Sequence, residues 1–188
     1  MNKVATSYPG LTRVVFSEGE IAARVRELAR EIDAFYPGED ELLVIGLLKG
    51  AFMFVSDLVR AINRPSLQVD FLTAALYGDG SDASGEVELL HDLDAPIEGR
   101  HVLLVEDIVD SGKTLNRVGD VLGGKSPRSL EVCAFLHKHI ADGLRYEPRW
   151  VGFDAPSDWL VGYGLDLGER YRHLPFVGAI APEDGRGT

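Results

Sequence analysis

The stretch VLLVEDIVDSGKTL, residues 102–115, combines acidic residues with residues that commonly bind phosphate. Glu106 and Asp107 end an apolar run, and adjacent carboxylates can accept hydrogen bonds from two vicinal hydroxyls, as on a ribose. The segment that follows offers free backbone N–H groups and a positive helix dipole to a phosphate. Its residues are Asp110, Ser111, Gly112, Lys113 and Thr114. The stretch therefore predicts a site for a phosphorylated sugar.

Two other interpretations of this stretch compete with the sugar site. The Gly-Lys-Thr tail resembles a P-loop, but that pattern requires a glycine at position 107. Asp107 stands there, and its carboxylate would repel a nucleotide phosphate, so we reject a P-loop. The plainer alternative is an acidic turn that caps a helix, with Asp110 as N-cap. Residue types alone leave that alternative open.

The elements that position this stretch are predicted to alternate between strands and helices. A capping box at Ser17 and Glu20, followed by apolar residues at helical spacing, predicts a helix to Phe35. Further helices are predicted over 54–62 and 113–122. Apolar runs predict strands over 42–48, 67–74, 101–106, 130–136, 150–153, 159–163 and 176–180.

This alternation predicts an α/β fold, with a doubly wound, mainly parallel sheet flanked by helices. With 188 residues, 45% of them hydrophobic, we expect a single domain over 1–188. Ligands of such sheets collect at the carboxyl ends of the strands. The junctions at 48–50 and 106–114 are therefore the places to seek chemistry.

Composition limits the class of protein. The net charge of −11 argues against binding nucleic acid over a broad surface, and it requires local devices to hold an anion. No apolar run approaches the about 18 residues that span a bilayer, and the first ten residues carry no apolar signal region. We therefore expect no membrane partner and a cytoplasmic location. The single cysteine, Cys133, lies in an apolar run and is interpreted as a buried, inert thiol.

The stretch at 102–115 resembles the phosphoribosyl-pyrophosphate signature of type I phosphoribosyltransferases. LLKGAFMF, residues 47–54, resembles their pyrophosphate loop. The segment WVGF followed by WLVGYGLDLGERYR, within 150–172, resembles the carboxyl-terminal part of hypoxanthine-guanine phosphoribosyltransferases. The resemblance implies a core over about 39–140, a small hood formed by the terminal segments at about 1–20 and 145–188, and a mobile lid at about 75–88.

The resemblance assigns roles to the acidic stretch. It implies that Glu106 and Asp107 hold the ribose 2- and 3-hydroxyls, directly or through a magnesium ion. Asp110 matches the carboxylate near purine N7, which acts as general base. The residues matching the cradle for the 5-phosphate are Ser111, Gly112, Lys113 and Thr114.

The resemblance also implies a pyrophosphate site. Lys49 and Gly50 match a loop that often contains a cis peptide bond, and Arg172 matches an arginine that contacts pyrophosphate. Asp166 matches a carboxylate that orders a metal ion, through water. In the lid Tyr77 matches the family's tyrosine, whereas the serine that usually precedes it is replaced by leucine.

Three residues match the purine site. Lys138 matches the lysine that donates to the purine 6-oxo group, and an ammonium, which has donors only, favours that acceptor over the 6-amino group of adenine. Trp159 stands where an aromatic ring stacks on the purine. The backbone of Leu160 matches a contact at the purine edge.

The implied activity is purine salvage: transfer of a 5-phosphoribosyl group from phosphoribosyl pyrophosphate to N9 of hypoxanthine or guanine, with Mg²⁺ as cofactor. The resemblance further implies a homodimer or homotetramer. Two alternatives stay open, a related transferase that prefers xanthine and a nucleotide-sensing regulator of the same fold that binds RNA. The excess of 30 acidic over 19 basic residues argues against the second.

Overall fold

The computed structural model describes residues 8–181, apart from 9, 37, 39, 78–85, 92, 94–95 and 141. In chain order its elements are β1 (Leu11–Phe16), α1 (Glu18–Phe35), β2 (Leu42–Leu48), α2 (Phe52–Ala61), β3 (Leu67–Tyr77), β4 (Glu86–His91), β5 (His101–Val109), α3 (Lys113–Gly123), β6 (Ser129–His137), β7 (Trp150–Asp154), β8 (Trp159–Val161) and β9 (Val177–Ile180). No helix in the described part is long and apolar enough to cross a membrane.

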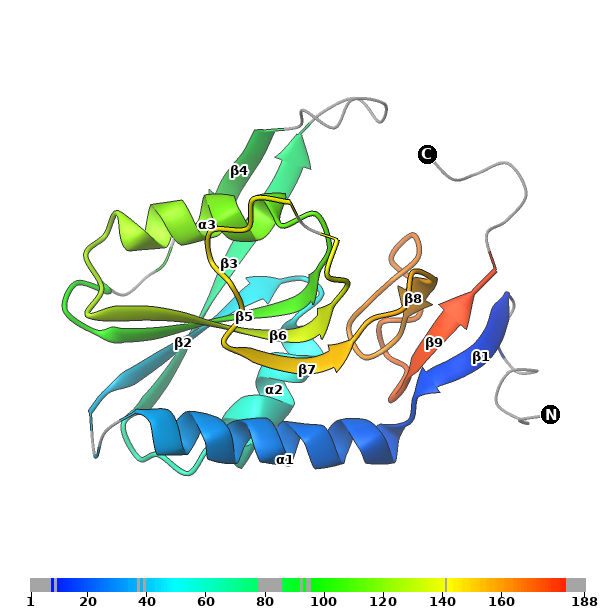
Figure 1. Cartoon of the computed structure of the whole chain (residues 1–188), viewed down its shortest axis with the longest axis horizontal. Helices are drawn as coiled ribbons and strands as arrows, with labels where there is room; N and C mark the ends of the chain where they lie inside the picture. The colour runs from blue at the N-terminus through cyan, green and yellow to red at the C-terminus, as the bar shows by residue number, and fades with distance from the viewer. Residues whose placement is uncertain are drawn as a thin grey trace.

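The larger sheet has six strands in the order β4-β3-β2-β5-β6-β7. All neighbouring pairs are parallel except β3 and β4 at one edge. Helices α1 and α2 cover one face of this sheet and α3 covers the other, as Figure 1 shows. The prediction of a mainly parallel α/β sheet flanked by helices is confirmed, and the carboxyl ends of β2, β5 and β6 lie along one edge.

The core has one layer on each face of the larger sheet, because side chains on a strand alternate between faces. In β2, Leu42 and Val44 pack with the buried side chains of α1 and α2, whereas Leu43 and Ile45 pack with those of α3. Cys133 is fully buried in the first layer, and burial raises the pKa of its thiol, as expected for an inert cysteine.

A smaller sheet joins the two ends of the described chain. Its strands have the order β1-β9-β8, and both pairs are antiparallel. It lies beside the carboxyl ends of the larger sheet (Figure 1). The Tyr163 hydroxyl, which follows β8, donates to Asp57 Oδ2 of α2 at 2.8 Å and connects this sheet to the larger one. The two sheets thus enclose the edge where a ligand is expected.

Most predicted elements are confirmed, including the capping box at Ser17. The differences concern the end of β5, the presence of β1 and β4, and the sheet to which β7 belongs. Strand β5 continues through the acidic pair to Val109, because Ile108 and Val109 pair with Leu136 and His137 of β6. Strands β1 and β4 were not predicted from the sequence. Strand β7 falls in the range assigned to the hood but pairs with β6 in the larger sheet.

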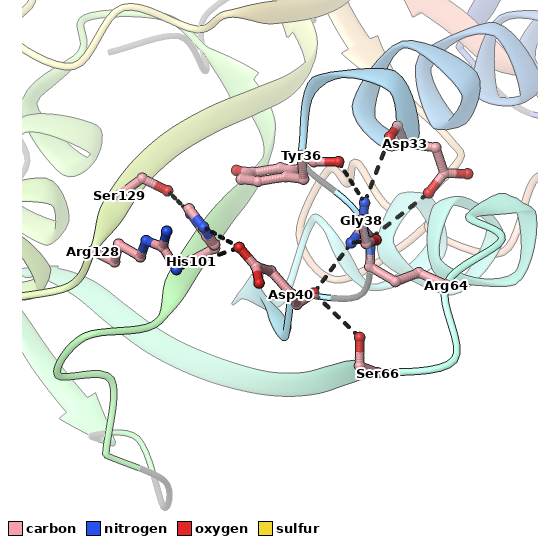
Figure 2. A network of polar contacts seen from close by, with 9 residues as sticks. All are labelled: Asp33, Tyr36, Gly38, Asp40, Arg64, Ser66, His101, Arg128 and Ser129. Carbon is pink, nitrogen blue, oxygen red and sulfur yellow. Dashed lines mark hydrogen bonds and ion pairs between the residues drawn. The ribbon is translucent and has the colours of Figure 1, made fainter.

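A polar network lies at the amino ends of the parallel strands, opposite the expected site, and Figure 2 shows its members. The Arg64 side chain is only 4% exposed, and its Nη1 donates to the carbonyl of Gly38 at 2.9 Å. Its Nη2 donates to the carbonyl of Tyr36 at 3.0 Å. Asp40 pairs with Arg128 at 3.3 Å, beside His101. The network connects the chain between α1 and β2 to the starts of β3, β5 and β6.

We predict that Arg64→Met lowers the free energy of unfolding by about 2–4 kcal/mol, because it leaves several carbonyls, most of them partly buried, without their donor. Urea denaturation of the purified protein measures this loss. The matched control is Arg60→Met, since the Arg60 side chain is 72% exposed and its ion pair with Asp57 lies in water. That control should cost less than about 0.5 kcal/mol. Equal losses would contradict the role given to Arg64.

Candidate active site

The predicted site residues gather where the parallel strands end. Lys49 follows β2, Asp110 follows β5 and Lys138 follows β6. In a parallel sheet these ends meet at one edge, so residues far apart in the chain become neighbours. The Lys138 backbone N–H also donates to the carbonyl of Val109 at 3.0 Å, which extends the pairing of β5 and β6 up to the site.

The acidic pair lies inside β5 rather than in the turn after it. Glu106 is buried, and its Oε2 has no hydrogen-bond partner among the described residues. Burial and the neighbouring Asp107 carboxylate raise the pKa of Glu106 well above its usual value. Burial also raises the pKa of Asp107, although backbone N–H donors and Arg172 oppose that rise. Such buried, incompletely paired carboxylates are typical of a functional site.

The loop after β2 packs directly on the acidic pair. The Leu48–Lys49 peptide bond is cis, as the resemblance implies. A Cβ atom on Gly50 would overlap the Asp107 carboxylate, and a Cβ on Gly164 would overlap the Gly50 carbonyl oxygen. The Asp107 carboxylate therefore packs directly on the Gly50 backbone, and the Gly164 backbone packs directly on the Gly50 carbonyl. Gly50 and Gly164 permit this approach, which any larger residue would prevent.

The predicted phosphate cradle forms the start of α3. Gly112 is the N-cap and has a φ of 75°, the left-handed region that favours glycine. No side chain caps the helix, and the first intrahelical bond runs from the Asn116 N–H to the Gly112 carbonyl at 2.9 Å. The first-turn N–H groups thus lack intrahelical acceptors and face the direction in which a helix attracts anions. Asp110 does not act as the side-chain N-cap, which removes the plainer interpretation of this turn.

Asp110 and Lys138 form an ion pair, with Lys138 Nζ donating to Asp110 Oδ2 at 2.9 Å. The Asp110 side chain is 49% exposed and that of Lys138 is 19% exposed. The lysine side chain is therefore largely covered, whereas the carboxylate reaches solvent. A proton acceptor and a cation thus stand side by side, ready to contact neighbouring atoms of one ligand.

Arg172 lies in the segment that connects β8 to β9. Its Nη1 donates to the Gly164 carbonyl at 2.8 Å, and its Nη2 pairs with Asp166 Oδ1 at 2.9 Å. The same Nη2 lies 3.3 Å from Glu169 Oε1, and that oxygen lies 3.2 Å from Lys49 Nζ. Lys49 and Arg172 are thus brought together, through Glu169, at the side of the acidic pair.

The remaining predicted residues lie in different surroundings. Trp159 begins β8 and is 59% exposed, so its ring face is open to a ligand, whereas Leu160 is buried. Trp159 belongs to the smaller sheet, whereas Lys138 follows β6 of the larger sheet and pairs with Asp110. Tyr77 ends β3, where its backbone pairs with Glu86, and the predicted lid residues 78–85 lie outside the described residues.

Sequence reasoning missed Gly164 and Glu169. Gly164 is the last residue of the motif V-G-Y-G, and only its φ of 101° and its contact with the Gly50 carbonyl reveal its part in the site. Glu169 is an exposed acid among many, and its importance appears only when the fold places Lys49 beside it.

Comparison with known proteins agrees with this geometry. A model of the phosphoribosyl transferase domain matches residues 15–166. The chain is 45% identical over 168 residues to a hypoxanthine phosphoribosyltransferase of Salmonella typhimurium, covering 89% of this chain and 94% of that protein. It is 46% identical over 184 residues to a hypoxanthine-guanine phosphoribosyltransferase of Mycobacterium avium, covering 95% of this chain and 90% of that protein. A crystal structure of a hypoxanthine phosphoribosyltransferase from Staphylococcus aureus superposes with a TM-score of 0.87 at 36% identity, covering 97% of each chain.

We predict that Glu106→Gln stabilises the metal-free protein at neutral pH, by about 1–3 kcal/mol, because it removes a buried carboxylate that lacks a partner. The folded protein holds the Glu106 proton more tightly than the unfolded chain does, since its pKa is raised. Native stability should therefore fall as the pH rises above 4.5, the ordinary pKa of a glutamate, and toward the raised pKa. The advantage of the variant should therefore be smallest near about pH 4.5 and larger at pH 8.

Urea denaturation in a chelator, repeated across this pH range, measures that advantage. The control is Glu98→Gln, an exposed glutamate in the turn before β5, which should change stability by less than about 0.5 kcal/mol. A Glu106→Gln variant that is less stable than the native chain at pH 8 would show that the carboxylate is compensated in the free protein.

Proposed function

Because this chain belongs to the phosphoribosyl transferase family, we propose that it is a purine salvage enzyme. It transfers the 5-phosphoribosyl group of phosphoribosyl pyrophosphate to N9 of hypoxanthine or guanine, releasing pyrophosphate and forming IMP or GMP. The observation that carries this proposal is the match to hypoxanthine and hypoxanthine-guanine phosphoribosyltransferases over nearly the full length of both chains. The roles that we propose for the site residues follow the parts of that reaction.

Glu106 and Asp107 hold the ribose. Glu106 is buried and Asp107 is half-buried near the carboxyl end of β5, where ribose hydroxyls supply the donors that Glu106 Oε2 lacks. The 5-phosphate binds the uncapped N-terminus of α3, with Gly112 allowing close approach and the hydroxyls of Ser111 and Thr114 as further donors. Lys113, the first residue of the helix, adds a positive charge.

Asp110 and Lys138 recognise the purine and move its proton. Lys138 donates to the 6-oxo group, and Asp110 accepts the proton from N7 as N9 forms its bond to the ribose C1. Their ion pair holds the two groups 2.9 Å apart before the base arrives, so little reorganisation is needed. The exposed ring of Trp159 stacks on the purine, and the backbone of Leu160 contacts its edge.

Lys49 and Arg172 stabilise the negative charge that develops on pyrophosphate, together with the backbone amides of the loop at Gly50. The ribose C1 develops positive charge at the same time, and the carboxylates of Glu106 and Asp107 lie close to that charge. Tyr77 and the lid segment then cover the site and exclude water, which would otherwise attack the sugar.

Mg²⁺ fits the donor set of this site. The described residues hold no cluster of three or more ligands that would form a protein cage for a metal. Mg²⁺ prefers one or two carboxylates plus waters and substrate oxygens, and Glu106 has a buried oxygen without a partner. Glu106 and Asp107 would hold it on the ribose side, and Asp166, already paired with Arg172, through water. When bound, the ion neutralises pyrophosphate charge and so favours its departure.

The proposal extends to the setting of the enzyme. A homodimer or homotetramer and a cytoplasmic location are expected from the resemblance to salvage enzymes. A preference for xanthine and a regulator that binds RNA are the competing functions, and the experiment that follows separates them.

The experiment incubates the protein with phosphoribosyl pyrophosphate, Mg²⁺ and each of hypoxanthine, guanine, xanthine and adenine, and measures nucleotide formation. We expect products from hypoxanthine or guanine and at least about 100-fold less from adenine, because Lys138 offers no acceptor to a 6-amino group. Product from xanthine alone would favour the xanthine-preferring alternative. The absence of any product, with RNA retained on a filter at low salt, would support the regulator. Product from adenine alone would contradict the role of Lys138.

Asp110→Asn should lower kcat by about 10²–10⁴-fold while changing the KM for phosphoribosyl pyrophosphate much less, because an amide cannot accept the purine proton. Steady-state kinetics with hypoxanthine measure both constants. Asp142→Asn, in the loop after β6, is a matched control that removes one carboxylate outside the site and should keep native kinetics. If Asp110→Asn retains native turnover, Asp110 is not the base.

A further inference from the structure

One oxygen of Glu169 contacts both cations that the proposed function assigns to pyrophosphate. Its Oε1 lies 3.2 Å from Lys49 Nζ and 3.3 Å from Arg172 Nη2. Lys49 follows β2 and Arg172 follows β8, so only the fold brings them to the same carboxylate. A carboxylate between two cations occupies the place that a phosphate oxygen would take, since both are anionic oxygen acceptors.

A short turn presents the Glu169 carboxylate to these cations. Its backbone N–H donates to Asp166 Oδ2 at 2.7 Å, and Leu167 and Arg170 form a β-bridge that closes the turn. Glu169 itself has a φ of 66°, which is uncommon for a residue other than glycine. Asp166 also pairs with Arg172, so the turn and the arginine are fixed to each other.

The contact contributes little to stability but much to the charge of the site. The side chains of Lys49 and Glu169 are 64% and 63% exposed, and ion pairs in water add little to folding. Arg172 and Lys49 lower the pKa of Glu169, so the carboxylate remains ionised at neutral pH. An incoming pyrophosphate group must therefore displace a negative charge that already satisfies both cations.

We propose that Glu169 is a positioning residue that acts as an exchangeable counter-ion for Lys49 and Arg172. It holds the two cations in place while the site is empty, gives them up to phosphoribosyl pyrophosphate, and takes them back as pyrophosphate leaves. By competing for the cations it weakens pyrophosphate binding and speeds release of this product. The inference rests on the proposed function, because it takes these cations as the pyrophosphate site.

Glu169→Gln tests the proposal, because the amide keeps the shape of the side chain and removes its charge. We expect the inhibition constant for pyrophosphate and the KM for phosphoribosyl pyrophosphate both to fall, by about two- to tenfold, with kcat unchanged or lower. Glu169→Asp, which restores the charge on a shorter chain, should lie between the variant and the native protein. A merely structural role would change thermal stability and leave this pattern of constants unmoved.

The matched control is Glu27→Gln. Glu27 lies on α1, is 50% exposed and pairs with Arg24, so its removal changes the net charge by the same amount at an exposed ion pair outside the site. It should leave both constants at native values. The proposal is overturned if Glu169→Gln binds pyrophosphate as the native chain does or more weakly, or if Glu27→Gln tightens it equally.

Calorimetric titration of Mg²⁺ and inorganic pyrophosphate into each variant gives the same comparison without catalysis. Native protein that binds pyrophosphate but transfers no phosphoribosyl group would defeat the proposed function and leave this comparison valid. Active native protein with unchanged pyrophosphate affinity in Glu169→Gln would defeat only the role of Glu169.

Discussion

The site depends on two adjacent carboxylates that β5 carries out of water. Val105, just before the pair, is paired with both Gly46 of β2 and Cys133 of β6, and Glu106 is paired with Ala134 of β6, so the pair is held at the end of the larger sheet. A buried carboxylate without a cation or a donor is unfavourable, and the raised pKa of Glu106 expresses that cost. Proteins retain such groups where a ligand supplies what is missing, and a sugar with vicinal hydroxyls and a divalent cation supplies both donors and charge. Strand β5 thus contributes to the core and also buries Glu106 Oε2 without a hydrogen-bond partner.

The backbone around the pair is shaped by the same constraint. For the loop after β2 to bring its amides toward a ligand on β5, it must touch Asp107, and only glycine at position 50 leaves room for the carboxylate. The segment that carries Arg172 must then approach the far side of this loop, and Gly164 leaves room for the Gly50 carbonyl. The Tyr163 hydroxyl fixes that segment to α2 through Asp57. Close packing of these three segments thus positions charges that no single element could bring together.

The sequence predicts what depends on local pattern and misses what depends on the assembled fold. Apolar runs and a capping box were enough to predict α1, β2, β6 and α3, and the order of these elements predicts the edge where Lys49, Asp110 and Lys138 meet. Glu106 and Asp107 suggest a turn in the sequence, because two charged residues seldom lie within a buried strand. In the structure, Ile108 and Val109 continue the pairing of β5 with β6. Strand β1 alternates weakly, with exposed Thr12 and Arg13, and it is a strand only because β9 pairs with it. The ion pair of Asp110 with Lys138 and the contacts of Glu169 join distant parts of the chain, so no local pattern encodes them.

Charge compensation inside the site explains how a chain of net charge −11 can bind polyanions. Each described cation of the site, apart from Lys113 at the helix start, is already paired with a carboxylate: Lys138 with Asp110, Lys49 with Glu169, and Arg172 with Asp166 and Glu169. These pairs keep the cations ordered and prevent them from forming ion pairs with other carboxylates of the acidic surface. Each pair is also at least partly exposed, so a ligand can exchange for the carboxylate without first opening the core. Binding then becomes an exchange of anions at fixed cations, which needs less reorganisation than the ordering of free side chains. The affinity for each ligand is in turn limited by the carboxylate that the ligand replaces.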